Sequence, residues 1–289
     1  MTGRIALLIL LLSLAPVAAS AQTVSRQDSV RVMTELEMRD GSRFVGEVVE
    51  ETADSIRLRT LSGTIVEVTK SEIEKRRTIA GRVNDGRFVA FDPNRTRLFF
   101  GPTARPIGQG QWYIANYWLF FGFVGGGVTD NLTMAAGGLL IPQLADNFFY
   151  VAPKLTLAGN DRQSAGIGVL AGFVGLDEGD YGNFGILYGV YTRGWPDNAI
   201  TIGAGFGFVE GEVANSPTLM IGYERSLSRR TKFITENWIF PNAEVIMYSG
   251  GIRFYGERLA ADLAFIGASE RNDSVPLLPW IGFAYNFGK

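Results

Sequence analysis

LPWIGFAYNFGK, at residues 278–289, alternates between two kinds of side chain. Every second position is large and apolar or aromatic, namely Ile281, Phe283, Tyr285 and Phe287, and the positions between them are small or polar. Because successive side chains of a β-strand point to opposite faces, this stretch predicts a strand with one continuously apolar face. A strand of a soluble sandwich could show this pattern once, so its recurrence along the chain is the decisive observation.

The same alternation recurs from about Trp112 onward and divides residues 111–289 into about twelve expected strands. Their ranges are 112–120, 122–129, 132–141, 147–158, 163–175, 183–193, 199–209, 215–227, 231–240, 243–255, 258–268 and 278–288. Short connections alternate with mostly longer, more acidic ones. A closed barrel is the only sheet that leaves no backbone group unpaired in lipid, so the sequence predicts an all-β, antiparallel, up-and-down transmembrane β-barrel. Ten or fourteen strands are the alternatives.

The start of the chain carries an export signal. Arg4 precedes an apolar run over residues 5–14, and small residues follow as far as Ala21. This arrangement predicts a signal peptide over residues 1–21, cleaved between Ala21 and Gln22. No later stretch has about 18 consecutive apolar residues, so we expect no helix that would hold the chain in the inner membrane. We therefore expect a protein of the cell outer membrane, in contact with its lipid.

A charged region with few aromatic residues precedes the barrel. Residues 34–77 contain four short β-runs and two hairpin signals, Asp40-Gly41 and Ser62-Gly63. The expected core consists of Val45, Val48, Ile56, Leu58, Ile65 and Val68. The turn spacing resembles that of small barrels of the SH3-like or Sm-like kind, which implies a small periplasmic domain. Because about 45 residues give a marginal core, we expect this domain to lean on a neighbour or on a periplasmic partner.

Two further features lie between this domain and the barrel. The basic residues Lys75-Arg76-Arg77 are expected to form a solvated end of the domain, because an exported chain with a net charge of −2 does not favour nucleic acid as a partner. Residues 78–110 are rich in Gly, Asn, Asp, Pro and Arg, so we expect a linker there.

Charged side chains within the strands indicate which face is inside. An unpaired Arg or Lys on the lipid face near the midplane costs about 2–4 kcal/mol, so such residues should face the lumen. The expected lumen charges are Lys154, Arg193, Glu224, Glu236, Arg253 and Asp262, and Tyr150, Tyr191 and Met220 are expected on the same face. Glycines are also expected inside, at Gly203, Gly205 and Gly207, either to make room for large side chains or to line a permeation path.

The expected turns fix which charges meet. A turn at Gly256-Glu257 would pair Arg253 with Ala260 and make Asp262 a diagonal neighbour of Arg253. A two-residue turn at Pro241-Asn242 would pair Glu236 with Met247. The resulting mixed-sign lumen is either a salt-bridged interior or a polar channel wall.

Catalysis is constrained by composition, because the chain has no histidine and no cysteine. Triads built on Ser-His-Asp or Cys-His and metal sites built on histidine are thereby excluded. Only carboxylate chemistry remains, for example Glu224 with Glu236, and we expect that pair to be structural. No enzyme activity, cofactor or metal is therefore expected.

Residues 97–288, with RPIGQGQWYIANYW, GVTDNLTMAAGG and the aromatic closing strand, resemble outer-membrane β-barrel proteins of Gram-negative bacteria. The closing strand with Ile281, Phe283, Tyr285 and Phe287 looks like the signal read by the barrel assembly machinery, although Gly288 and Lys289 follow the last aromatic residue. The resemblance implies a location and an assembly route. For function, we expect a small channel or passive transporter with a polar, glycine-lined lumen. The alternative is a closed structural or envelope-interaction barrel whose N-terminal domain binds a periplasmic partner.

Overall fold

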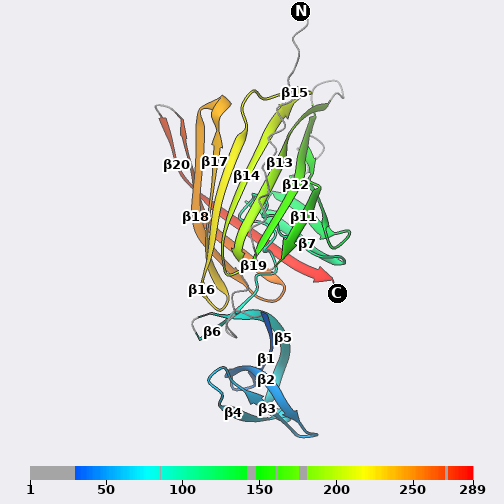
Figure 1. Ribbon diagram of the computed structural model, residues 1–289, viewed down its shortest axis with the longest axis vertical. Helices are drawn as coiled ribbons and strands as arrows, with labels where there is room; N and C mark the ends of the chain where they lie inside the picture. Colours follow the sequence, from blue (N-terminus) through cyan, green and yellow to red (C-terminus); the bar gives the residue numbers. More distant parts are fainter. Residues whose placement is uncertain are drawn as a thin grey trace, which may run out of the picture.

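The computed structural model describes residues 30–84, 86–141, 148–160, 162–175, 181–270 and 273–288. The expected signal peptide and its cleavage site at Ala21 and Gln22 lie outside these residues. Figure 1 shows a large β-barrel and, below one of its ends, a smaller sheet. No helix in these ranges is long and apolar enough to cross a membrane.

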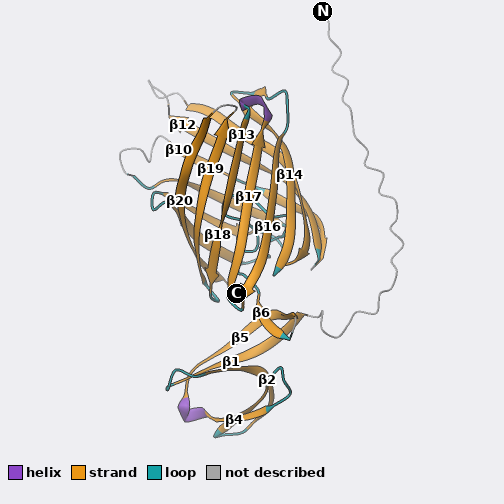
Figure 2. Cartoon of the chain, turned by 90° about the vertical axis from the view of Figure 1, so that its left-hand side faces the viewer, coloured by secondary structure: helices purple, strands orange, loops and turns teal. Residues whose placement is uncertain are grey.

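The smaller part is a six-stranded antiparallel sheet with the order β4-β3-β2-β1-β5-β6. Its strands are β1 (Val30–Met38), β2 (Arg43–Glu51), β3 (Ser55–Arg59), β4 (Ile65–Thr69), β5 (Ile73–Asn84) and β6 (Arg87–Ala90), and the 3-10 helix η2 (Lys70–Glu72) joins β4 to β5. Figure 2 shows that the sheet is strongly curled. Both expected hairpin turns are present, with Gly41 and Gly63 at φ values of 85° and 87° that glycine adopts without strain.

The core of this sheet contains three of the expected residues. Its buried members are Leu36, Met38, Ile56, Leu58 and Val68, and Val48 packs against them. Val45 packs instead against a second cluster that includes Met33 and Ile79. Ile65 was expected in the core but is 46% exposed, because it lies three residues before the buried Val68 in β4 and therefore points to the opposite face of the strand.

The boundaries of the sheet differ from the expected ones. Strand β5 continues to Asn84 and β6 follows, so the domain ends near residue 90 and residues 78–90 are not a linker. The basic residues at 75–77 are inside β5 rather than at a free end. Arg76 bonds Glu51 at 3.0 Å and Arg77 bonds Glu37 at 3.0 Å. Hydrogen bonds from Lys70 and Arg76 hold the pKa of Glu51 below its usual value.

The large part is a closed antiparallel barrel of twelve strands, which confirms the predicted fold class and strand number. The strands are β7 (Gln111–Tyr117), β8 (Phe121–Gly127), β9 (Leu132–Leu139), β10 (Phe148–Val151) with β11 (Lys154–Asn160), β12 (Gln163–Gly175), β13 (Tyr181–Trp195), β14 (Asn198–Val209), β16 (Thr218–Ser228), β17 (Thr231–Phe240), β18 (Val245–Tyr255), β19 (Leu259–Glu270) and β20 (Asp273–Gly288). Closure comes from β20 pairing with β7.

Two details explain the strand count. β10 and β11 follow one another along the same neighbours, β9 and β12, and are separated at Ala152 and Pro153, where proline has no N–H for the ladder. They therefore act as one interrupted strand. The two-residue β15 (Glu212–Val213) pairs only with the end of β14, outside the closed ring. A second 3-10 helix, η5 (Pro241–Ala243), connects β17 to β18.

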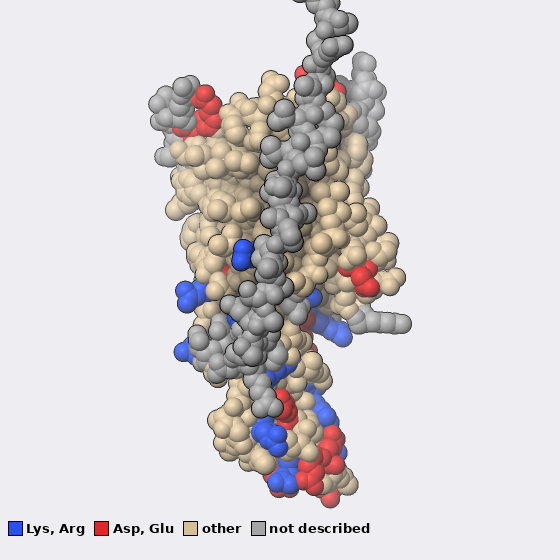
Figure 3. All heavy atoms as spheres, viewed as in Figure 1, with Lys and Arg blue, Asp and Glu red and all other residues tan. Residues whose placement is uncertain are grey.

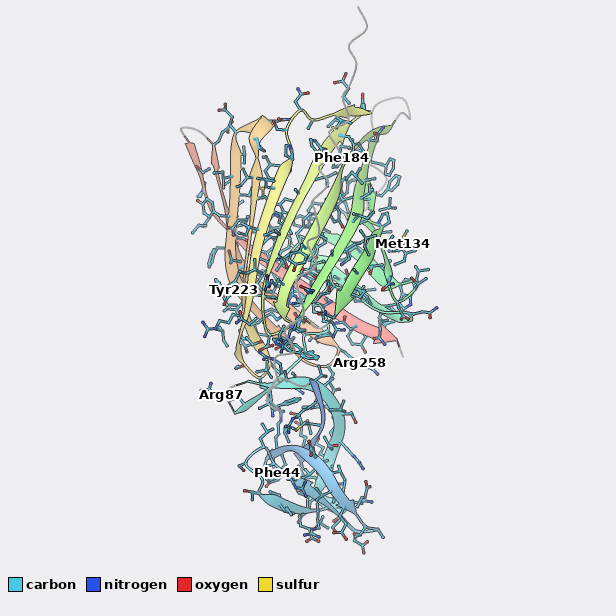
Figure 4. All side chains as sticks on the ribbon, viewed as in Figure 1. Phe44, Arg87, Met134, Phe184, Tyr223 and Arg258 are labelled. Atoms are coloured by element: carbon cyan, nitrogen blue, oxygen red, sulfur yellow. The ribbon has the colours of Figure 1, made fainter. Side chains whose placement is uncertain are left out.

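The outer wall of the barrel is apolar. Ile281, Phe283, Tyr285 and Phe287 lie on the outward face of β20 and are 36–42% exposed, whereas Ala284 between them is 1% exposed. In Figure 3 most of the barrel wall carries no charged side chains, and charges gather on the smaller sheet. Figure 4 shows Arg258 at the barrel end next to the sheet and Phe184 towards the far end. An apolar wall between two polar ends is the surface that a lipid bilayer requires.

Candidate functional site

Residues 91–110, which we call the luminal loop, run from the end of β6 into the barrel before β7 begins. The loop turns back sharply, because the backbone N–H of Leu98 donates to Gly101 O at 2.8 Å and that of Thr103 donates to Thr96 O at 2.9 Å. At its tip Leu98 and Phe99 are 0% and 1% exposed. They pack against barrel side chains that include Tyr117, Met220, Ile234 and Trp280. The segment that was expected to be a linker is a plug inside the barrel.

Arg253 connects the barrel wall to the luminal loop. Its Nε lies 2.5 Å from Asp262 Oδ1 on the neighbouring strand, and its Nη1 lies 2.9 Å from Asp92 Oδ2 on the loop. The guanidinium also donates to the loop carbonyls of Asn94, Arg97 and Leu98. Arg97 Nη1 donates in turn to Asp262 Oδ2 at 3.0 Å. Two charges of the wall and two of the loop are therefore joined in one buried network.

A second part of the network is centred on Glu224. Lys232 Nζ lies 2.6 Å from Glu224 Oε2 and 3.1 Å from Asp92 Oδ2, so it links this carboxylate to the first part. Arg105, from the returning half of the loop, donates to the other oxygen of Glu224. Lys232 is 0% exposed and Glu224 is 1% exposed. The lumen at this level is filled by paired charges.

Two more wall residues hold the backbone of the loop. Lys154 Nζ donates to Thr103 O at 2.6 Å and to Arg105 O at 2.8 Å. Glu236 accepts from the backbone N–H groups of Phe100 and Gly101 at 3.0 and 2.9 Å. Donors and acceptors of the loop are thus satisfied by side chains from opposite parts of the wall, which fixes its position.

Five of the six expected lumen charges lie inside the barrel, and Arg193 does not. Lys154, Glu224, Glu236, Arg253 and Asp262 are at most 5% exposed. On β13 the inward residue is Thr192, which is 1% exposed and shares a hydrogen bond with Thr201. Its neighbours Arg193 and Tyr191 therefore face outward, which corrects the expectation for both. Arg193 lies near a strand end, where an arginine on the lipid side costs only about 0–1 kcal/mol.

The registers of two hairpins also differ from the expected ones. Arg253 stands directly opposite Asp262 rather than diagonal to it, because the turn is longer and pairs Tyr255 with Ala260. Met247 stands opposite Trp238, not Glu236. Each change moves the pairing by two residues, so the inward faces are preserved although the partners change.

Glycines on the inner face make room for large neighbouring groups. A Cβ on Gly222 would lie 2.1 Å from Leu98 Cδ1 of the luminal loop. A Cβ on Gly168 would lie 2.5 Å from the hydroxyl oxygen of Tyr188, and one on Gly172 would lie 2.6 Å from Cζ of Phe184. At these positions the glycines accommodate side chains from the loop and from the adjacent strand.

The six-stranded sheet docks on the barrel end from which the loop enters. The Glu35 carboxylate is 0% exposed and forms ion pairs with Arg229 at 3.0 Å and Arg230 at 2.5 Å, both in the β16–β17 turn. Arg82 of β5 bonds Asp197 of the β13–β14 turn at 2.6 Å. Met33, Ile79, Val83 and Phe88 form one apolar cluster with Tyr255 and Ala260 of the barrel. Sheet, loop and barrel are therefore in continuous contact.

Several buried charges were not expected from the sequence. Asp92, Arg97 and Arg105 belong to the luminal loop, which has no periodic pattern to mark it as buried. Lys232 could have been found, because it lies four residues before Glu236 in one strand and must share its face. No group of three or more acidic side chains in the described ranges is placed to hold a metal ion.

Comparisons with known proteins find similar folds only among solved structures. No family model and no curated protein sequence matches the chain. The KdgM porin matches with 8% identity and a TM-score of 0.45, covering 62% of this chain and 98% of the porin. A loop-deletion mutant of OmpT, an outer membrane protein of Vibrio cholerae, matches with 10% identity and a TM-score of 0.37, covering 90% and 100%. OmpF of Salmonella typhi in complex with daunomycin matches with 9% identity and a TM-score of 0.34, covering 90% and 98%.

Proposed function

We propose that the chain is an outer-membrane transport barrel that is closed at rest by its luminal loop and opens when the loop moves. The observation that carries this proposal is the ionic contact between loop and wall. Asp92, Arg97 and Arg105 of the loop meet Lys232, Asp262 and Glu224 of the wall, and all six side chains are buried. The expected polar lumen is retained in this proposal as the surface that is exposed when the loop leaves.

The chemistry of this contact favours a loop that can leave. Burying ion pairs carries a desolvation penalty, and well-packed apolar side chains of similar volume often stabilise a protein as much or more. A permanently closed barrel would therefore gain nothing from a charged contact. After separation, by contrast, both charged surfaces are compatible with water.

The six-stranded sheet provides a means of moving the loop. Strand β6 ends at Ala90, and the first buried charge of the loop is Asp92. A displacement of the sheet away from the barrel therefore acts directly on the loop. The sheet is held mainly by ion pairs with three turns and by one apolar cluster. We infer that the sheet lies in the periplasm and transmits such a displacement. The proposal contains no catalytic step.

A cysteine pair tests whether the loop moves, since the chain has no cysteine of its own. The backbone N of Ala104 lies 2.9 Å from Thr192 Oγ1, so the Cα atoms of the two residues are at most about 7 Å apart, which is within reach of a disulfide in the variant Ala104→Cys with Thr192→Cys. The pair is introduced into a loosened background, Lys154→Met with Glu236→Gln, which removes two wall groups that hold the loop backbone. In planar bilayers we expect low conductance for the natural chain, higher conductance for the loosened variant, and loss of that increase after oxidation of the cysteines. Unchanged conductance on oxidation, or a loosened variant as closed as the natural chain, would refute the proposal.

The alternative remains a closed barrel that supports the envelope through a periplasmic partner of its N-terminal sheet. The observation in its favour is the separate six-stranded sheet, on which charged side chains gather (Figure 3). The oxidised cysteine variant separates the two functions in cells. Full restoration of envelope integrity in a deletion strain by the locked barrel would favour the alternative.

A further inference from the structure

A cavity of about 110 Å³ lies between the luminal loop and the inner side of the barrel wall, where strands β7 to β13 and β17 contribute its lining. Its walls are aromatic and include Phe100, Tyr117, Phe123, Tyr150, Tyr188 and Trp238. The rings are in contact, with centroids 4.9 Å apart for Tyr117 and Phe123 and 6.3 Å apart for Phe123 and Tyr150. Phe100 is 47% exposed, so the cavity is open to solvent. Such a wall offers a planar apolar group several stacking and edge contacts.

Two residues that line this cavity carry hydrogen-bond groups without a partner among the described residues. The Arg97 side chain is 4% exposed and uses Nη1 for Asp262 and for the carbonyls of Leu98 and Phe99. Its Nε and Nη2, however, are buried and have no hydrogen-bond partner among the described residues. Thr133 Oγ1 is likewise buried, and it has no hydrogen-bond partner among the residues that the structure describes. Both residues line the cavity.

The free edge of Arg97 has a specific chemistry. Nε–H and Nη2–H lie side by side on one edge of the guanidinium and match the two oxygens of a carboxylate. Tyr117 covers one face of this guanidinium, with Cζ 5.3 Å from the ring centroid. The arginine is thereby held in one orientation by Asp262, by two carbonyls and by an aromatic ring before any ligand arrives.

The composition of the buried groups in the lumen also favours an anion over a cation. Five basic side chains (Arg97, Arg105, Lys154, Lys232 and Arg253) face four carboxylates (Asp92, Glu224, Glu236 and Asp262), so basic groups outnumber acidic ones by one. Lys154 lines the cavity and donates to loop carbonyls, and no carboxylate lies within ion-pair distance of it among the described residues. The described part of the cavity lining therefore contains two basic side chains, Arg97 and Lys154, and no carboxylate.

We propose that this cavity binds a small aromatic carboxylate, with its ring on the aromatic wall and its carboxylate on Nε and Nη2 of Arg97 and on Thr133 Oγ1. This names the class of solute for the transport route and in that respect rests on the proposed function. Binding itself needs only the closed barrel that the structure shows. A cavity of comparable size is known to accept a benzene ring.

Isothermal titration calorimetry on the full-length chain, folded in detergent micelles, tests the site with benzoate as the probe. Benzamide keeps the ring and removes the charge, and acetate keeps the charge and removes the ring. We expect benzoate to bind at least roughly tenfold more tightly than either, because only benzoate makes both kinds of contact. Equal affinity for benzoate and benzamide would overturn the proposed role of Arg97.

Two variants locate the probe. Arg97→Lys keeps the charge and removes the paired donors, and we expect roughly tenfold weaker benzoate binding. Thr133→Val keeps the shape and removes the hydroxyl, and it should weaken binding by a smaller factor. Arg225→Lys, on the exposed face of β16, is the matched control and should bind as the natural chain does. Unchanged affinity in both cavity variants would overturn the proposal, and heat-modifiable migration on a gel verifies that each variant is folded.

The oxidised Ala104→Cys/Thr192→Cys chain separates this inference from the proposed function. It should bind benzoate normally although it does not open. If benzoate binds but oxidation of the cysteines leaves the conductance unchanged, loop movement alone is refuted. If oxidation lowers the conductance but benzoate does not bind, the binding site alone is refuted.

Discussion

Replacing Arg253 by methionine is expected to lower the free energy of unfolding by about 2–4 kcal/mol, because several buried hydrogen bonds from a charged group are lost, and such bonds contribute about 1.5–3 kcal/mol each before the remaining partners compensate. Arg253 is 0% exposed, and its guanidinium contacts two carboxylates and three loop carbonyls. Asp92 keeps Lys232 and Asp262 keeps Arg97 in the variant, so neither carboxylate is left without a counter-charge. The loss therefore comes chiefly from weaker hydrogen bonding of the three carbonyls and of both acids, since Asn94 O and Leu98 O also accept from Arg97.

Urea unfolding of the full-length chain in micelles, followed by tryptophan fluorescence, measures this loss. The double variant Arg253→Met with Asp262→Leu should lose less free energy of unfolding than the two single variants lose together. We expect a coupling energy of about 1–3 kcal/mol. Arg225→Met on the outer face is the control and should change stability by less than about 0.5 kcal/mol. A loss below about 1 kcal/mol for Arg253→Met would show that water surrounds this arginine and that the loop does not seal the lumen.

Further predictions address assembly, loop packing and docking. Tyr285→Ala with Phe287→Ala removes two outward aromatic side chains from β20, and we expect less folded, heat-modifiable protein in the outer-membrane fraction; normal amounts would contradict the assembly signal. Gly222→Ala would place a Cβ 2.1 Å from Leu98 Cδ1, so the loop should be displaced and become accessible to added protease. Gly189→Ala is the control, because its Cβ meets nothing within 4 Å, and the loop should stay protected from protease in that variant. Glu35→Gln removes the carboxylate shared by Arg229 and Arg230, and faster hydrogen exchange in the β16–β17 turn is expected, in contrast to Glu50→Gln on the exposed face of the sheet.

The barrel was predictable from the sequence because lipid imposes a simple rule on every strand. Alternation of large apolar with small or polar residues holds from β7 to β20, so the strand count and the inward faces followed from local pattern. Where that rule is relaxed, the prediction failed. Arg193 lies near the end of β13, where lipid no longer excludes charge, and its parity was inferred from Tyr191, which also faces outward.

The luminal loop could not be predicted in the same way. Its residues are polar and Arg-rich, and they have no period of two because they pair with side chains rather than with a sheet. Arg97 meets Asp262 at a separation of 165 residues, and Arg105 meets Glu224 at a separation of 119. No local sequence pattern indicates contacts between residues that are so far apart in the chain. The charged residues expected in the lumen were the available clue, since all five that face inward contact the loop directly.

The position of Arg97 joins the two proposals in one physical step. Its Nη1 binds Asp262 and so holds the loop to the wall, while its Nε and Nη2 have no hydrogen-bond partner among the described residues, and the residue lines the cavity. The cavity is built from the loop, with Arg97 and Phe100, and from the wall, so it exists only while the loop is in place. A ligand that binds one state of the loop better than the other must shift the populations toward that state. Benzoate should therefore lower the conductance of the Lys154→Met/Glu236→Gln chain, and benzamide should not. Equal conductance with both compounds would mean that binding and opening are independent.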